Sequence, residues 1–386
     1  MRNLGEPAFQ IIEVKGEHYQ MGYQHGRQVM PLRPQIIMAM EARFAQLEQE
    51  GADDDFERLV EATRQVLERV DPATIALVRG LADGLTLEFE RLLRYNLAAF
   101  LRDALITRKN LNGPSDGCTT WAATGPATAD GRPILAKNRD YRLEHLPLQV
   151  VVRAEPAQGY HYIFVTSAGS PGVFVAGFNE AGLVVADSHV STGDIGPGLP
   201  TYALSMHLLE AHHSVRSALD YLCTTPRLGR NNLLLADADG DSALFEIGHR
   251  HSAVVEAAAG LLVSTNHYRS PAMKPYFVDT DPPARRGNTF ERYQIAKGRL
   301  NSAYGRIDLT LAKQLMAAHA DRLGSLCCHP SPVSETATIA AMIFLPVQRQ
   351  MHFCHGQPCQ DEYHTFTFTK AVPRFKSSNC SHRLDA

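Results

Sequence analysis

The chain of 386 residues has few cysteines, no marked excess of charge and no long apolar run. Seven cysteines are too few, and odd in number, for a disulfide scaffold; they fit a reducing compartment with free thiols. The formal net charge of −3 lacks the basic excess typical of nucleic-acid and membrane-surface binders. No segment approaches the roughly 20 apolar residues of a membrane span. The charged N-terminus also has no signal-peptide core. We therefore expect a cytoplasmic protein with no nucleic-acid or membrane partner.

What is present is the composition of a folded protein. Hydrophobic residues make up 44% and charged residues 20%, which excludes a disordered or fibrous chain. No internal repeat of 20 to 50 residues is visible, so a solenoid or propeller is not indicated. The composition favours a globular enzyme and leaves open which of the seven thiols is important.

The hydrophobic pattern changes near residue 110. Before it, apolar residues recur at helical spacing and predict helices over 56–70, from Pro72 onward and over 88–105. Turn-forming residues fill 110–117. After them the sequence predicts hairpin-linked strands, with helices over 201–221 and 290–318. The expected strands lie in 119–123, 134–137, 148–154, 160–166, 173–178, 183–187, 233–236, 243–247, 254–264, 338–345, 350–353 and 363–369. This order predicts an α+β protein in which helices cover antiparallel sheets.

The most informative motif is Gly117-Cys118-Thr119-Thr120, at the point where the turn-rich segment becomes the first strand. A cysteine nucleophile needs thiolate character and a nearby base. If the bond before Cys118 were cut, the new α-amino group would lie within reach of the sulfur. Its reference pKa near 8 suits a general base at neutral pH. Gly117 gives the scissile bond backbone freedom. The alternative is that Cys118 is a small buried residue that begins a strand.

Five motifs in order resemble the isopenicillin-N acyltransferase family of N-terminal-nucleophile hydrolases, peptidase family C45, whose precursors cleave themselves. They are GEHYQMGYQHG at 16–26, VRGLADG at 78–84, GCTT with the following NRDY at 117–120 and 138–141, GFNEAG at 177–182 and TNH at 265–267. The resemblance extends over roughly residues 8 to 345 and implies the family's αββα sandwich, preceded by a helical N-terminal segment.

The resemblance also implies roles for individual residues. Gly117–Cys118 is the autocleavage bond, and Cys118 becomes the nucleophile with its own amine as base. Asp140 holds the cysteine region and the amine, and Asn266 donates to the oxyanion, an effect worth on the order of 3 kcal/mol. Asp140 could instead be a strand-end turn residue, and Asn266 a turn cap. Further candidates for supporting the site are Asn138, Thr119, His267, Ser334 and Thr336.

Two positions depart from the pattern. Lys137 stands where the distant bile-salt-hydrolase relatives have an arginine, and Glu335 stands where the acyltransferase family has a late arginine. The C-terminal side of the pocket is therefore expected to differ from the family's. This leaves the substrate, and penicillin-type chemistry in particular, undetermined.

Other histidines, cysteines and acids give weaker patterns. The C-terminal cysteines are adjacent or five apart rather than in C-x2-C pairs, so we expect no metal site. His207, His212 and His213 are expected on a helix surface. The acidic stretch 237–241 is expected to be a hairpin turn, because it lacks the glutamate that ends a calcium loop.

We predict a self-processing cysteine amidohydrolase that acts on a small N-acyl amine or amide through an acyl-Cys118 thioester. It is expected to split into a helical segment, 1–117, and a catalytic segment, 118–386, which remain associated as one domain. No cofactor is expected, and acyl-CoA would enter only as a co-substrate. The alternatives are an acyltransferase from acyl-CoA to an amine such as a β-lactam nucleus, and an uncleaved binding protein that lost the activity.

Overall fold

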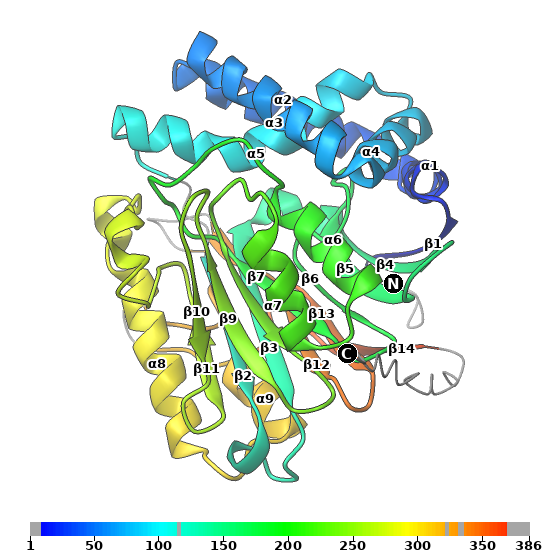
Figure 1. Cartoon of the computed structure of the whole chain (residues 1–386). Coiled ribbons are helices and arrows are strands. Elements are labelled where there is room, and N and C mark those ends of the chain that lie inside the picture. Colours follow the sequence, from blue (N-terminus) through cyan, green and yellow to red (C-terminus); the bar gives the residue numbers. More distant parts are fainter. Residues whose placement is uncertain (1–8, 114–116, 321–323, 331–335, 369–386) are drawn as a thin grey trace, which may run out of the picture.

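The computed structural model describes residues 9–113, 117–320, 324–330 and 336–368 (Figure 1). Its helices are α1 (His18–Gln28), α2 (Arg33–Gln49), α3 (Asp54–Val70), α4 (Pro72–Leu85), α5 (Phe89–Lys109), α6 (Thr201–Ala211), α7 (Val215–Thr224), α8 (Asn288–Ser302) and α9 (Leu309–Met316). Short 3-10 turns lie at Met30–Leu32, Gly125–Ala127, Leu143–Leu148, Lys274–Tyr276 and Pro283–Arg285. No described helix has the length and apolar character needed to cross a bilayer.

The strands form two sheets. The 8-stranded sheet has the order β1-β4-β5-β6-β7-β8-β9-β10, and the 6-stranded sheet has the order β11-β2-β3-β12-β13-β14. Strands of the larger sheet are β1 (Gln10–Gly16), β4 (Gln149–Pro156), β5 (Tyr162–Ser167), β6 (Ala176–Asn179), β7 (Val184–Ser188), β8 (Asn232–Ala236), β9 (Ser242–Ile247) and β10 (Ser252–Glu256). Those of the smaller sheet are β2 (Gly117–Ala123), β3 (Ile134–Arg142), β11 (Leu261–Ser264), β12 (Thr336–Leu345), β13 (Gln350–His355) and β14 (Tyr363–Thr367).

Three apolar cores define four layers. One core lies between the sheets, where Phe178 and Leu244 of the larger sheet meet Phe344 and Phe353 of the smaller one. A second joins the larger sheet to the N-terminal helices, α6 and α7. A third joins the smaller sheet to α8 and α9, around Trp121. Figure 1 shows the same arrangement, with α1–α5 above the sheets and α8 along one side. The predicted α+β class and αββα sandwich are confirmed.

The N-terminal segment folds mainly as its local signals predict. The Asp53 side chain accepts the Phe56 N–H to begin α3, and the Asp71 side chain does the same for Thr74 in α4. One element was missed: β1 pairs in parallel with β4 and so joins the edge of the larger sheet. The segment before Cys118 thus contributes a strand as well as helices. Together with the packing of the N-terminal helices, this strand joins the segment to the larger sheet.

Two long helices predicted in the catalytic segment are each broken. The helix expected over 201–221 is α6 and α7, because Ser214 caps a new helix by accepting the Ser217 N–H. The helix expected over 290–318 is α8 and α9, which are separated by Gly305 at φ +76°. Asp308 then caps α9 by accepting the Leu311 N–H. The acidic stretch 237–241 joins β8 to β9 as predicted.

Candidate active site

Cys118 is the second residue of β2, which lies between β11 and β3 in the smaller sheet. β2 pairs with β3 so that Cys118 lies opposite Arg139 and Gly117 opposite Asp140. Side chains alternate along a strand. Ala122 belongs to the core between the sheets and Trp121 to the core under α8 and α9. By the same alternation, the buried Cys118 side chain is directed toward the space between the sheets.

Asn266 and Arg292 hold the backbone of Cys118 on both sides of its α-carbon. The Cys118 N–H donates to Asn266 Oδ1 at 3.0 Å. Arg292 Nη1 donates to the Cys118 carbonyl, and Arg292 Nη2 donates to the same Asn266 oxygen. Arg292 is only 1% exposed, and its Nε donates to Asn288 Oδ1 at 2.7 Å. A buried guanidinium with several acceptors fixes this strand more firmly than one neutral hydrogen bond could.

The sequence analysis placed Asn266 at the site but did not identify Arg292. Asn266 follows β11 closely, and β11 pairs with β2, so a turn far along the chain comes to lie beside Cys118. Asn266 Nδ2 donates to the backbone carbonyl of His189 at 2.8 Å. In this state the amide therefore orients the Cys118 N–H. Arg292 carries no local signal, because an arginine on a helix is ordinarily a surface residue.

Asp140 lies opposite Gly117, on the N-terminal side of Cys118. Its carboxyl is buried, and Oδ1 accepts a hydrogen bond from Thr338 Oγ1 at 2.6 Å. Oδ2 is buried without a hydrogen-bond partner among the described residues. A Cβ added at Gly117 would come within 2.8 Å of Oδ2, so glycine is what lets the chain pass so close. Burial raises the pKa of Asp140, although the Arg292 charge and the Thr338 hydrogen bond oppose the rise.

The charges around Cys118 act in opposite directions. Burial raises the pKa of the Cys118 thiol; Lys137 lowers it, and Asp187 raises it. Lys137 is buried and forms an ion pair with Asp187. Asp187 also accepts from Asn231 Nδ2 at 2.7 Å. The lysine that replaces the relatives' arginine therefore lies beside the thiol and is largely neutralised by its partner.

A cavity of about 80 Å³ adjoins Cys118. Its wall includes residues from α5, β3 and the larger sheet, and it is rich in arginine. The lining charged groups are Arg43, Arg102, Asp103, Lys137, Arg139, Asp140, Asp187, His189 and Arg230. Because α5 belongs to the segment before the cleavage bond, both predicted segments build one cavity.

A second polar network on this wall was not predicted. Asp103 of α5 accepts from His189 at 2.9 Å and lies 3.3 Å from Arg230 Nε. Burial alone would raise the pKa of Asp103, but Arg230 and His189 outweigh it and lower the pKa to about 2. His189 also presents its carbonyl to Asn266. This network connects α5 to the turn that carries Asn266.

The five supporting residues predicted from the sequence differ in what they contact. Thr119 meets the site, since its Oγ1 accepts from Arg292 Nη1 at 3.1 Å. Asn138 instead donates to the carbonyls of Met316 and Leu326 at 2.9 and 2.7 Å, so it holds a neighbouring loop. The remaining three of the five predicted residues are His267, Ser334 and Thr336.

His267 lies in a packed turn. Its Nδ1 is 2.9 Å from Thr289 Oγ1, the ring stacks near Phe290, and burial lowers its pKa to about 4. Thr336 is buried at the start of β12, opposite Arg142. Thr338, two residues on, is the threonine that contacts Asp140. Ser334 and Glu335 lie outside the described residues.

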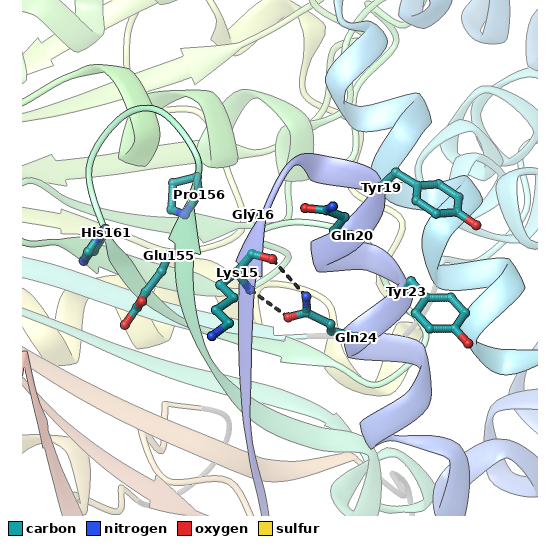
Figure 2. Close-up of a pocket in the computed structure, with 9 residues that line it drawn as sticks. All are labelled: Lys15, Gly16, Tyr19, Gln20, Tyr23, Gln24, Glu155, Pro156 and His161. Carbon is teal, nitrogen blue, oxygen red and sulfur yellow. Dashed lines mark hydrogen bonds between the residues drawn. The ribbon is translucent and has the colours of Figure 1, made fainter.

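A larger, open cavity of about 600 Å³ lies elsewhere, between α1 and the end of β4 (Figure 2). Gln24 crosses it to the backbone of Lys15, accepting from the N–H at 2.8 Å and donating to the carbonyl at 2.9 Å. Tyr19 and Tyr23 point away from this pair in Figure 2. It shares no lining residue with the Cys118 cavity, and its lining contains no cysteine, serine or threonine.

The sequence predicts no metal site. The structure nevertheless gathers His319, Cys327, His329 and Cys359 into one cluster, away from the lining of the Cys118 cavity. Their spacing in the sequence gave no indication of this, because the two cysteines that meet are neither adjacent nor closely spaced.

Comparison with known proteins identifies the family. The model of the acyl-coenzyme A:6-aminopenicillanic acid acyl-transferase family matches residues 127–360, more than half of the chain. The chain belongs to this acyltransferase family. The match begins after β2, so it includes Asp140 and Asn266 but does not include Cys118. The predicted resemblance is confirmed.

Other similarities are distant. An uncharacterized protein of Archaeoglobus fulgidus is 21% identical over 360 residues, which cover 81% of this chain and 58% of that protein. The chain thus spans little more than half the length of that relative. A variant of conjugated bile acid hydrolase from Clostridium perfringens aligns with 12% identity and a TM-score of 0.44, over 67% of this chain and all of that one. Penicillin V acylase from Agrobacterium tumefaciens aligns with 14% identity and a TM-score of 0.33, over 64% and 77%. Family membership rests on the family model.

Proposed function

We propose that this member of the acyltransferase family is a self-processing cysteine amidohydrolase acting on a small N-acyl compound through an acyl-Cys118 thioester. The observation that carries the proposal is the environment of Cys118. Its N–H and carbonyl are both held, by Asn266 and Arg292, and it borders a cavity lined by charged side chains. A cysteine that merely began a strand would need neither a buried arginine nor an adjoining cavity.

Maturation consists of the cleavage of the Gly117–Cys118 bond. The Cys118 thiolate attacks the Gly117 carbonyl carbon, the C–N bond breaks, and the nitrogen takes a proton to become the Cys118 amine. Water then hydrolyses the thioester, leaving a carboxylate on Gly117 and a free thiol on Cys118. Asp140 Oδ2 lies close to Gly117 and has no hydrogen-bond partner among the described residues. This supports a role for Asp140 in transferring that proton.

Turnover repeats the same chemistry on a substrate. The free amine takes the proton of the thiol, and the thiolate attacks the acyl carbonyl. The proton then passes to the leaving amine, and water releases the acid from the thioester. Asn266 Oδ1 would orient the Cys118 amine. For Asn266 Nδ2 to stabilise the oxyanion, it would have to give up its hydrogen bond to His189.

The surroundings of Arg139 favour a substrate that carries an anionic group. It lines the Cys118 cavity, is 7% exposed, and donates to the neutral acceptors Gln149 and Ser167 at 2.8 and 3.2 Å. Within the described part of the chain it has no carboxylate partner within 4.0 Å. A buried, uncompensated cation is costly, and a substrate carboxylate would relieve that cost. We therefore favour N-acyl amino acids and related acids over uncharged amides.

Acyl transfer is the second candidate, because the matching family is described by an acyl-coenzyme A acyl-transferase. Both reactions share the acyl-Cys118 intermediate and differ in what attacks it. Release of free acid from an N-acyl compound without any thioester donor supports hydrolysis. Strict dependence on acyl-CoA would replace hydrolysis with transfer. We place the protein in the cytoplasm, where its described cysteines, all free thiols, would stay reduced.

Intact-mass measurement of purified protein under denaturing conditions tests the proposal. Two chains are expected, 1–117 and 118–386, and Cys118→Ala should leave one chain. Cys223→Ala is the matched control, because that thiol is exposed and remote from the cavity. A wild-type chain that stays whole under native conditions would remove self-processing and favour the uncleaved binding protein. A panel of N-acyl amino acids, uncharged N-acyl amines and β-lactams then identifies the substrate class.

A further inference from the structure

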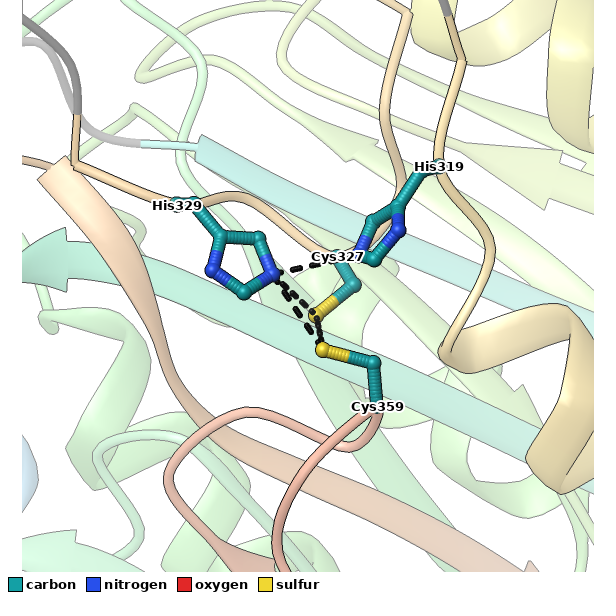
Figure 3. Close-up of side chains that lie close together, drawn as sticks. All are labelled: His319, Cys327, His329 and Cys359. Atoms are coloured by element: carbon teal, nitrogen blue, oxygen red, sulfur yellow. Dashed lines mark hydrogen bonds between the residues drawn. The ribbon is translucent and has the colours of Figure 1, made fainter.

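Four side chains with metal-binding atoms meet on the outer side of the smaller sheet (Figure 3). His319 follows α9, Cys327 and His329 precede β12, and Cys359 follows β13. One ligand atom from each lies within 4.8 Å of all the others. In Figure 3 the two thiols and the two rings converge on one point from three segments of the chain.

The separations match those of a tetrahedral zinc site. Zn–S bonds of about 2.3 Å and Zn–N bonds of about 2.0–2.1 Å imply S–S, N–N and S–N edges of about 3.8, 3.3 and 3.6 Å. The Sγ atoms of Cys327 and Cys359 are 3.5 Å apart, and the Nε2 atoms of His319 and His329 are 3.1 Å apart. His329 Nε2 lies 3.8 Å from Cys327 Sγ and 3.2 Å from Cys359 Sγ. These four of the six edges are within about 0.4 Å of the tetrahedral values, and the two edges between His319 and the sulfur atoms are within 4.8 Å.

The rival explanation is a disulfide between Cys327 and Cys359. A disulfide needs an S–S distance of about 2.05 Å. The observed 3.5 Å is a separation of free thiols, and both cysteines are free. A disulfide would also leave unexplained why His329 Nε2 lies within 3.8 Å of both sulfur atoms and why the His319 ring joins the same cluster.

We propose that His319, Cys327, His329 and Cys359 bind one zinc ion. All four positions are filled by protein, which is the arrangement of a structural rather than a catalytic zinc site. Two thiolates and two neutral imidazoles balance the charge of Zn²⁺. The ion would join the segment that follows α9 to the turn after β13, which lie far apart in the sequence.

The zinc site would support the wall behind the candidate active site. The Leu326 carbonyl, next to Cys327, accepts from Asn138 Nδ2 on β3 at 2.7 Å. The Cys328 N–H donates to Thr338 Oγ1 at 2.8 Å, and that hydroxyl donates to Asp140 at 2.6 Å. Loss of the ion is therefore expected to loosen the loop that positions Thr338. The site shares no residue with the Cys118 chemistry, so zinc binding and self-processing can fail independently.

Metal analysis of the full chain, purified without chelators, tests the proposal. About one zinc per chain is expected. After zinc removal under reducing conditions, Co²⁺ should give a thiolate-to-cobalt charge-transfer band and the intense visible bands of tetrahedral cobalt. Cys359→Ser and His319→Ala should lose both signals, whereas the matched control Cys223→Ser should keep them, since Cys223 lies outside the cluster.

Two results would overturn the proposed zinc site. The first is a wild-type protein that lacks stoichiometric zinc and whose reduced form gives no tetrahedral cobalt spectrum. The second is a Cys359→Ser variant that retains the zinc content of the wild type. A Cys327–Cys359 disulfide, found as the loss of two hydrogens by peptide mass mapping, overturns it if the reduced protein binds no Co²⁺. If a variant does not fold, the cobalt spectrum of the wild-type chain decides by itself.

Discussion

Arg292 of α8 donates a hydrogen bond to the backbone carbonyl of Cys118, from 174 positions further along the chain. The same guanidinium reaches Thr119 and Asn266, so it fixes the predicted nucleophile and its neighbour together. Arg292 is thus a buried cation at the candidate site.

Replacement of Arg292 by lysine should slow self-cleavage about 10- to 100-fold. Lysine keeps the charge but cannot donate to all four acceptors in fixed directions, and each lost charged hydrogen bond costs about 1.5–3 kcal/mol. The time course of chain splitting, followed by intact mass, measures the effect. Lys297→Arg, at an exposed position of the same helix, should cleave at the wild-type rate. Wild-type cleavage in Arg292→Lys would exclude this positioning role.

Substitutions of Lys137 and Asp187, the two members of the buried ion pair, should shift the pH dependence of self-cleavage in opposite directions. The reaction needs the thiolate, so its rate should rise with pH toward the pKa of Cys118, which burial raises. Lys137 lowers that pKa and Asp187 raises it. Lys137→Gln should therefore shift the rise to higher pH, and Asp187→Asn should shift it to lower pH. Lys137→Arg retains the charge and is the control. Identical pH profiles for all these variants would contradict the electrostatic account.

His25 should make the fold sensitive to acid. Its ring is buried in α1, its Nε2 has no partner among the described residues, and burial lowers its pKa from 6.5 to about 4. Below pH 6.5 the unfolded chain binds a proton here that the folded chain does not. The free energy of unfolding should therefore fall as pH drops toward 4, by about 3 kcal/mol from this group.

Urea denaturation from pH 7.5 to 4 measures this loss, in a Cys118→Ala background that keeps one chain. In His25→Gln the decline should be smaller by about the same 3 kcal/mol. Equal slopes for the parent and the variant would assign the acid sensitivity to other groups.

Gly80 should tolerate no side chain. A Cβ there would lie 2.0 Å from the backbone carbonyl of Tyr19, because α1 and α4 pack with their backbones in contact. Gly80→Ala should lower the free energy of unfolding by at least about 2 kcal/mol. Gly298 of α8 has open space around its Cβ position, so Gly298→Ala should raise it by about 0.5–1 kcal/mol. Urea denaturation of both in the Cys118→Ala background compares them, and equal effects would contradict the tight α1–α4 contact.

Local signals were enough for much of the fold. The caps at Asp53 and Asp71, and the change from helical to strand pattern near residue 110, gave the correct elements because hydrogen bonds within one turn decide them. β1 was missed because its pairing with β4 is long-range and parallel. The break at Ser214 did carry a local signal, a serine ahead of a new helical turn, and it was overlooked.

The sequence by itself determined the family and the class of fold, and it predicts Cys118, Asp140 and Asn266 as site residues because they belong to ordered motifs. Only the tertiary structure decided what surrounds them. Arg292 and Thr338 contact the site through sheet pairing and helix packing, which no local pattern encodes. The same holds for the cluster of His319, Cys327, His329 and Cys359. Its geometry depends on where three loops end in space, and the spacing of cysteines along the chain does not record that.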